Sequence, residues 1–135
     1  MTIELHRIGA TPMAQTLTIR GHALRVDGTA AEGGDDSGPN PHDLYDAALG
    51  ACKALTLLWY ARRKGLPVED VHTVVERDAS AERSGTYRLA TRLEVSGDLS
   101  DAQLAELEVV AQKCPVHKLM TQVTTEISTT VLRQP

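Results

Sequence analysis

Two cysteines, Cys52 and Cys114, are the residues best suited to covalent chemistry in this sequence. A thiolate can attack an electrophile, form a disulfide or bind a metal. Cys52 lies in an apolar stretch, where a small buried hydrophobe is the plain interpretation. Cys114 precedes Pro115 at a helix break, close to Lys113 and Lys118. A helix N-terminus and nearby cations lower the pKa of a thiol, so the residues alone favour Cys114 as the more reactive one.

Three roles are open to the pair. Both cysteines fall on the apolar stripes of different expected helices, so they could be inert core thiols or disulfide partners, if their Cα atoms come within about 7 Å. His117 could join them in a zinc site, although neither cysteine belongs to a CxxC pair. The histidines show no metal-ligand spacing among themselves; they are His6, His22, His42, His72 and His117.

The helix that must position Cys52 has clear ends. Asn40 is a good N-cap, Pro41 suits the first helical position, and Asp43 complements the helix dipole in the first turn. Basic residues followed by Gly65 mark the other end. The pattern predicts one helix over residues 41–64.

This helix is apolar nearly all round. From Ala47 to Ala61 its only charge is Lys53. Such a helix is normally buried, so the rest of the domain or a second chain must cover it. The face that carries Cys52 also carries Tyr45, Ala48, Leu49, Thr56 and Trp59.

The flanking segments predict an α+β fold with an antiparallel sheet, in a single domain spanning residues 1–135. Alternating residues and turn signals predict strands, and Ser100 to Gln103 reads as a capping box. The expected order is ββ-α-ββ-α-β. Its parts are strands at 16–19 and 23–26, a loop at 28–40, the helix at 41–64, strands at 71–77 and 86–95, a helix from 101 to about 113, one short turn at 117–120 and a last strand at 123–131.

Composition excludes several classes. The formal net charge is −4 and aromatic residues make up only 3%, which argues against nucleic-acid binding by a basic surface or by base stacking. No apolar run is long enough for a membrane span or a signal peptide. We therefore expect a cytoplasmic protein without nucleic-acid or membrane partners, whose cysteines are reduced at rest.

Two segments together resemble the OsmC/Ohr family, named for osmotically inducible protein C and organic hydroperoxide resistance. They are GGDDSGPNPHDLYDAALGACKALTLLWYARRKGLP (residues 33–67) and KCPVHK (residues 113–118), with the capping-box helix between them. The resemblance covers essentially the whole chain. Its long GGDDSGP form is closer to the general OsmC-like branch than to Ohr itself.

The resemblance implies an intertwined homodimer in which strands of each chain wrap two long central helices. It also implies thiol-dependent reduction of organic hydroperoxides without a metal or an organic cofactor. Cys52 matches the peroxide-attacking thiolate, and Cys114 matches the resolving cysteine that forms a disulfide with it. A dithiol reductant then regenerates the thiols; in Ohr members this is a lipoylated protein.

Ohr members also use an arginine from the N-terminal strands, held by a glutamate ten residues before the reactive cysteine. Arg20 is the position that we match to this arginine, with Arg25 as the second choice. Position 42 is His42 here, and the nearest acid is Asp43. We expect His42, Asp43, Leu49 and Trp59 to bind the substrate. An apolar pocket around Leu49, Leu55 and Trp59 would favour alkyl hydroperoxides over hydrogen peroxide.

Two other functions are open. The chain could be an OsmC-fold protein that binds a small apolar or thiol ligand, or serves in stress, without peroxidase turnover; the change at His42 favours this alternative. It could also be a structural dimer with buried, unreactive thiols.

Overall fold

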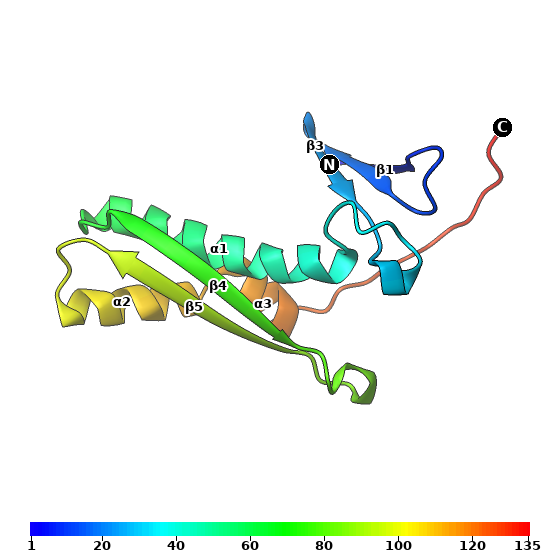
Figure 1. Cartoon of the computed structure of the whole chain (residues 1–135). Helices are drawn as coiled ribbons and strands as arrows, with labels where there is room; N and C mark the ends of the chain where they lie inside the picture. The colour runs from blue at the N-terminus through cyan, green and yellow to red at the C-terminus, as the bar shows by residue number, and fades with distance from the viewer. The chain divides into compact units, whose positions relative to one another are not determined.

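The computed structural model describes all 135 residues and has a mixed α+β fold with antiparallel sheets, as the sequence predicts (Figure 1). Its strands are β1 (Ile3–Arg7), β2 (Gln15–Ile19), β3 (His22–Val26), β4 (Asp70–Asp78) and β5 (Arg88–Ser96). Its α-helices are α1 (Pro41–Lys64), α2 (Asp101–Gln112) and α3 (Pro115–Gln122), and short 3₁₀ turns cover Ala30–Glu32 and Glu82–Ser84. None of the helices combines the length and hydrophobicity that a membrane span requires.

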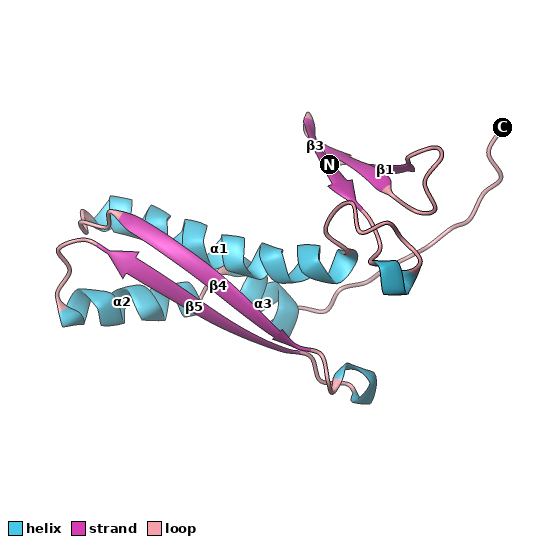
Figure 2. Cartoon of the chain, viewed as in Figure 1, coloured by secondary structure: helices cyan, strands magenta, loops and turns pink.

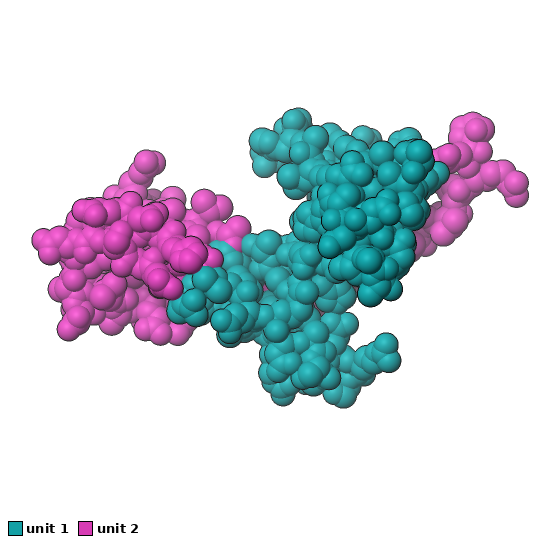
Figure 3. Space-filling model, viewed as in Figure 1, with its two compact units in different colours: residues 1–50, 74–92 teal, residues 51–73, 93–135 magenta.

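The chain divides into two compact units (Figure 3). Unit 1 comprises residues 1–50 and 74–92, and unit 2 comprises residues 51–73 and 93–135. The long elements α1, β4 and β5 contribute residues to both units.

In unit 1, the first three strands form an antiparallel sheet in the order β1-β2-β3. The loop that follows the sheet is organised by Asp27, which is only 2% exposed. Its carboxylate accepts hydrogen bonds from the amides of Gly28, Asp35 and Ser37 and from the Ser37 hydroxyl at 2.6 Å. The hydroxyl contact does most to lower the pKa of Asp27. A long loop is thereby fixed ahead of α1.

Helix α1 has the ends that the sequence predicts. Asp43 and Asn40 cap each other: the Asp43 amide donates to the Asn40 side chain at 2.9 Å, and the Asn40 amide donates to the Asp43 carboxylate at 3.0 Å. At the other end Gly65 has a left-handed φ of 68°, and the Leu66 amide donates to the Ala61 carbonyl at 2.9 Å. This pattern is a Schellman motif, whose left-handed residue is best supplied by glycine.

Unit 2 has the larger apolar core. Leu57 and Ala61 of α1 pack there with Leu107 of α2. Partly buried residues complete the core: Tyr60, Leu66, Val68, Leu93, Val95 and Leu99. The predicted capping box opens α2, since Ser100 accepts from the Gln103 amide and Gln103 accepts from the Ser100 amide.

Three details of the expected order are wrong. The structure adds β1 before the two predicted strands, and α3 has 8 residues where one short turn was expected. Residues 123–131 form no strand; Figure 2 shows the chain after α3 as loop. The alternating residues Val123, Ile127 and Val131 are 45%, 81% and 92% exposed. Alternation predicts a strand only where a neighbouring edge can pair with it, and neither β4 nor β5 pairs with this segment.

Candidate functional site

The two thiols meet at the start of α3, within unit 2. Cys52 comes from α1 and is half-buried, whereas Cys114 is the fully buried N-cap of α3. The Val116 amide donates to Cys52 Sγ at 3.5 Å, and the next amide, that of His117, donates to Cys114 Sγ at 3.4 Å. Both sulfurs are free thiols. Adjacent amides of one helix turn therefore hold both sulfurs, in the place where a helix dipole favours negative charge.

The two thiols differ in environment. Burial raises the pKa of Cys114, and the hydrogen bond from the His117 amide offsets this only in part. The neighbouring Cys52 thiol also raises the pKa of Cys114. The helix N-terminus that favours Cys114 as the more activated thiol is present, but burial acts against it by raising the pKa of this thiol. Which thiol reacts first stays a prediction.

A lysine lies beside the thiols. Lys53, the residue after Cys52, is only 4% exposed. Its ammonium donates to the Ala111 carbonyl at 2.9 Å and contacts His117 Nδ1 at 3.0 Å. Since an ammonium has no acceptor, Nδ1 must accept, and a neutral His117 carries its proton on Nε2. The charge of Lys53 acts to lower the pKa of Cys114.

The zinc alternative does not fit these contacts. No three His, Cys, Asp or Glu side chains come close enough together to hold a metal ion. The Nδ1 atom of His117 is occupied by Lys53. The cluster is a pair of thiols beside a cation.

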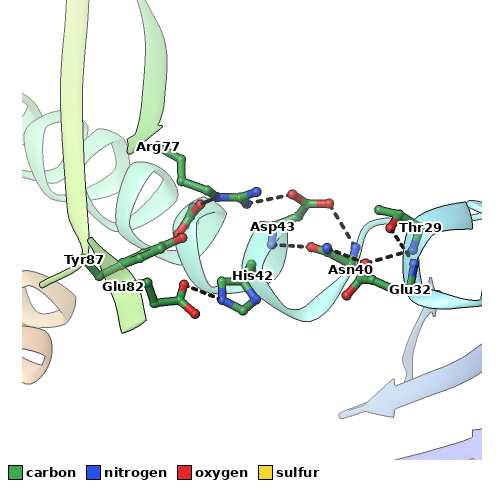
Figure 4. A network of polar contacts seen from close by, with 9 residues as sticks. Thr29, Glu32, Asn40, His42, Asp43, Arg77, Glu82 and Tyr87 are labelled. Carbon is green, nitrogen blue, oxygen red and sulfur yellow. Dashed lines mark hydrogen bonds and ion pairs between the residues drawn. The ribbon is translucent and has the colours of Figure 1, made fainter. Parts of the chain in front are cut away.

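A second polar cluster lies in unit 1, at the first turns of α1 (Figure 4). The Arg77 guanidinium forms ion pairs with two carboxylates, those of Asp43 at 2.7 Å and of Asp46. Asp46 is 6% exposed and also accepts from the Tyr87 hydroxyl at 2.6 Å. Arg77 therefore satisfies two acids on one face of the helix.

These contacts shift the acidity of each partner. The Asn40 amide, followed by Arg77, lowers the pKa of Asp43. Asp43 and then Asp46 raise the pKa of Arg77. Burial, followed by the hydrogen bond to Asp46, raises the pKa of Tyr87. These contacts hold Arg77 and the Asp43 carboxylate in their charged forms.

A pocket of about 360 Å³ lies next to this cluster in unit 1, lined by Pro41, His42, Tyr45, Glu82 and Tyr87. His42 Nε2 and Glu82 Oε1 are 2.8 Å apart, and the His42 ring meets the Tyr87 ring edge-on at a centroid distance of 5.9 Å. The volume of the pocket falls at the lower end of the range for small-molecule sites. The pocket combines aromatic walls with one polar pair.

The other predicted residues have varied surroundings. Arg20 lies in the turn after β2 with a left-handed φ of 48°, and its exposed side chain has no ion pair. The exposed Arg25 donates to the Ser37 hydroxyl at 2.8 Å. Leu49 is buried, whereas Trp59 is 59% exposed beneath the Arg63 guanidinium.

Sequence reasoning missed the arginine that Asp43 holds. It is Arg77 on β4, and no local pattern marks a partner so distant in the sequence. It also gave no role to Lys53, although a lone charge in an apolar helix was a usable signal. His117 was noted as a neighbour of Cys114 and as a metal candidate, but not as a partner of Lys53.

Known proteins agree with this fold. A family model described as OsmC-like protein matches residues 34–129. An OsmC-like protein from Mycoplasma pneumoniae is similar in structure, with a TM-score of 0.70, 16% identity, and coverage of 91% of this chain and 89% of that one. No curated protein matches the chain significantly.

Two further similar structures carry names that refer to hydroperoxides. An organic hydroperoxide resistance protein OsmC from Legionella pneumophila has a TM-score of 0.65 and 21% identity, covering 90% of each chain. The organic hydroperoxide resistance protein OhrB of Bacillus subtilis has a TM-score of 0.59 and 22% identity, covering 90% of this chain and 92% of that one. At such identities the likeness shows the shared fold. Because the family model spans most of the sequence, this chain belongs to the OsmC-like protein family.

Proposed function

We propose that this protein is a two-cysteine peroxidase that reduces organic hydroperoxides. The observation that carries the proposal is the meeting of two free thiols of unequal burial on adjacent amides of α3. A reactive thiol needs access to the peroxide, and the resolving thiol needs to lie close behind it. Cys52 meets the first condition and Cys114 the second.

The proposed reaction has two steps. The Cys52 thiolate attacks the distal peroxide oxygen, the O–O bond breaks, and the alkoxide takes a proton from water to leave as an alcohol. Sulfur is thereby oxidised to a sulfenic acid. Cys114 then attacks this sulfur, which forms the Cys52–Cys114 disulfide and releases water. A dithiol of the lipoyl type, in a reducing compartment such as the cytoplasm, would restore both thiols by exchange.

We also propose a homodimer. Leu55 and Trp59 of α1 are 66% and 59% exposed, in a stretch (residues 47–61) whose only charge is Lys53. A second copy that covers them would complete the burial that this apolar helix calls for. The exposed alternating segment 123–131 would gain a pairing edge in the same assembly. Light scattering of the purified chain measures the oligomeric state.

The substrate-binding roles of His42, Asp43, Leu49 and Trp59 stay predictions, as does activation by Arg20. Asp43 is held by Arg77 and Asn40, which suits a positioning role better than direct contact with substrate. Loss of affinity for cumene hydroperoxide in a Trp59→Ala variant, with the maximal rate retained, would support a binding role for Trp59.

The second candidate is a binding protein without turnover, and the pocket of unit 1 favours it. One experiment separates the two functions. Reduced protein is mixed with cumene hydroperoxide or hydrogen peroxide, and peroxide loss is followed with a dithiol reductant present. A peroxidase consumes the organic peroxide faster, and Cys52→Ser does not consume it. Equal, slow loss with wild-type protein and with Cys52→Ser would contradict the proposal.

A further inference from the structure

Lys53 is a buried cation without a carboxylate partner. None of the ion pairs in the structure includes it, and its two polar contacts are a carbonyl oxygen and a neutral imidazole nitrogen. Buried charges are costly and are normally paired with an opposite charge. Its charge acts on the Cys114 thiol, which in turn lies beside Cys52, and these two thiols are the groups of the cluster that can become anions.

The Lys53 ammonium and the two cysteine sulfurs all lie at the first turn of α3. Cys52 and Lys53 are consecutive on α1, and both side chains reach the first turn of α3: Cys52 at the Val116 amide, Lys53 at the His117 ring. Cys114 is the N-cap of that same turn. A cation beside a thiol favours its thiolate form.

We propose that Lys53 is the counter-ion of the Cys52 thiolate and that His117 positions it. The inference rests on the proposed function, because it assigns the thiolate charge to the cysteine placed to attack peroxide. When Cys52 loses its proton to solvent, the thiolate that forms becomes the anionic partner that the Lys53 ammonium lacks. His117 Nδ1 and the Ala111 carbonyl hold two of its three N–H groups, so one N–H remains to donate to a thiolate formed in this cluster.

Other titratable groups around the thiols do not supply this charge. Lys113 at the end of α2 and Lys118 of α3 are exposed. On β4 and β5, Asp70, His72 and Glu94 are exposed as well, and in β5 the flanking Leu93 and Val95 are the residues that pack on the core. Lys53 and His117 are the charged or titratable side chains in contact with this turn of α3.

The test measures the acidity of Cys52 without peroxide. In a Cys114→Ser background, Cys52 is the one thiol left, and neutral iodoacetamide reports its thiolate fraction across a pH series. We expect Lys53→Met to move the profile at least one pH unit to the alkaline side, which is about a tenfold slower reaction near neutral pH. Lys53→Arg should keep most of the parent profile, since it retains the charge.

His117→Leu provides a second variant in case Lys53→Met does not fold. It removes the acceptor that positions the ammonium and should shift the profile in the same direction by less, whereas His117→Gln keeps an acceptor and should shift it little. Folded Lys53→Met with the parent profile would overturn the proposal. Folded His117→Leu with the parent profile would overturn the positioning role.

The result is independent of the peroxidase assignment. A lysine-dependent profile in a protein that consumes no peroxide would contradict the proposed function alone. A protein that consumes organic peroxide through Cys52, with a profile that ignores Lys53, would contradict this inference alone.

Discussion

The two polar clusters of this protein each centre on one cation, and they treat it in opposite ways. In unit 1, Arg77 is matched by two carboxylates, Asp43 and Asp46. In unit 2, Lys53 has a carbonyl and an imidazole but no anion. A cation paired with carboxylates can link a helix to a strand. A buried cation without an anionic partner can instead stabilise a group that becomes anionic during the reaction. We therefore expect the first cluster to be structural and the second to be the reactive one.

The largest effect is expected from removing the proposed reactive thiol, Cys52. Cys52→Ser should lower organic peroxide consumption on the order of a thousandfold or more, because the remaining thiol, Cys114, is fully buried and has no second thiol to resolve it. Cys114→Ser should still react once and then over-oxidise to the sulfinic acid, since no resolving thiol is present. Mass spectrometry of the peroxide-treated variants distinguishes these states. A Cys52→Ser protein with full turnover would refute the assignment.

Replacing the two cations should have unequal effects on thermal stability. Arg77→Met leaves the buried carboxylate of Asp46 without its cation and should lower the thermal unfolding midpoint by roughly 5 °C. Lys53→Met removes a buried charge that has no carboxylate partner, so the midpoint should change by less than about 2 °C.

The matched control for these two variants is Arg20→Met, which alters an exposed arginine without an ion pair and should leave the midpoint unchanged. Its peroxidase rate tests the predicted role of Arg20 at the same time. Equal destabilisation by Arg77→Met and Lys53→Met would remove the distinction between the two clusters.

The two thiols should also differ in reactivity. Burial raises the pKa of Cys114, so in Cys52→Ser its alkylation near neutral pH should be about tenfold slower than that of Cys52 in Cys114→Ser. The rate of the Cys114 reaction should rise as the pH passes above the ordinary thiol range, where its thiolate forms. Iodoacetamide kinetics on the two reciprocal variants measure this order, and faster reaction of Cys114 would reverse it.

The smallest expected effect is the response of unit 1 to acid. The pKa of Asp43 lies below its ordinary 3.8 in the folded chain, so the unfolded chain binds the proton more readily. This contribution to stability is present above pH 3.8 and is lost as the pH falls through the lowered folded pKa. Urea unfolding at a series of acidic pH values should show the loss, and Asp43→Asn should reduce its slope. An unchanged slope in Asp43→Asn would assign the effect to other acids.

Local signals made most of the fold predictable. Asn40, Asp43 and Gly65 fixed both ends of α1 because caps depend on neighbouring residues alone. The ion pair of Asp43 with Arg77 and the contact of Lys53 with His117 join distant segments, so no short window of sequence contains them. The alternation at 123–131 predicted a strand for which this chain offers no pairing edge.

The burial of Cys114 shows the same limit within the candidate site. Its position at a helix N-terminus was readable from Pro115, but its pKa depends on its burial and on Cys52 and Lys53 of α1, which lie far away in the sequence. The local motif predicted the helix N-terminus at Cys114 but not the burial that raises the pKa of this thiol.

The most direct test of the account is the state of the two cysteines after one turnover. Fully reduced protein is mixed with one equivalent of cumene hydroperoxide, quenched in acid, and analysed by intact mass and peptide mapping under non-reducing conditions. The account predicts the loss of both thiols with formation of an intrachain Cys52–Cys114 disulfide. Two intact thiols after full exposure, or a disulfide that forms only between chains, would contradict it.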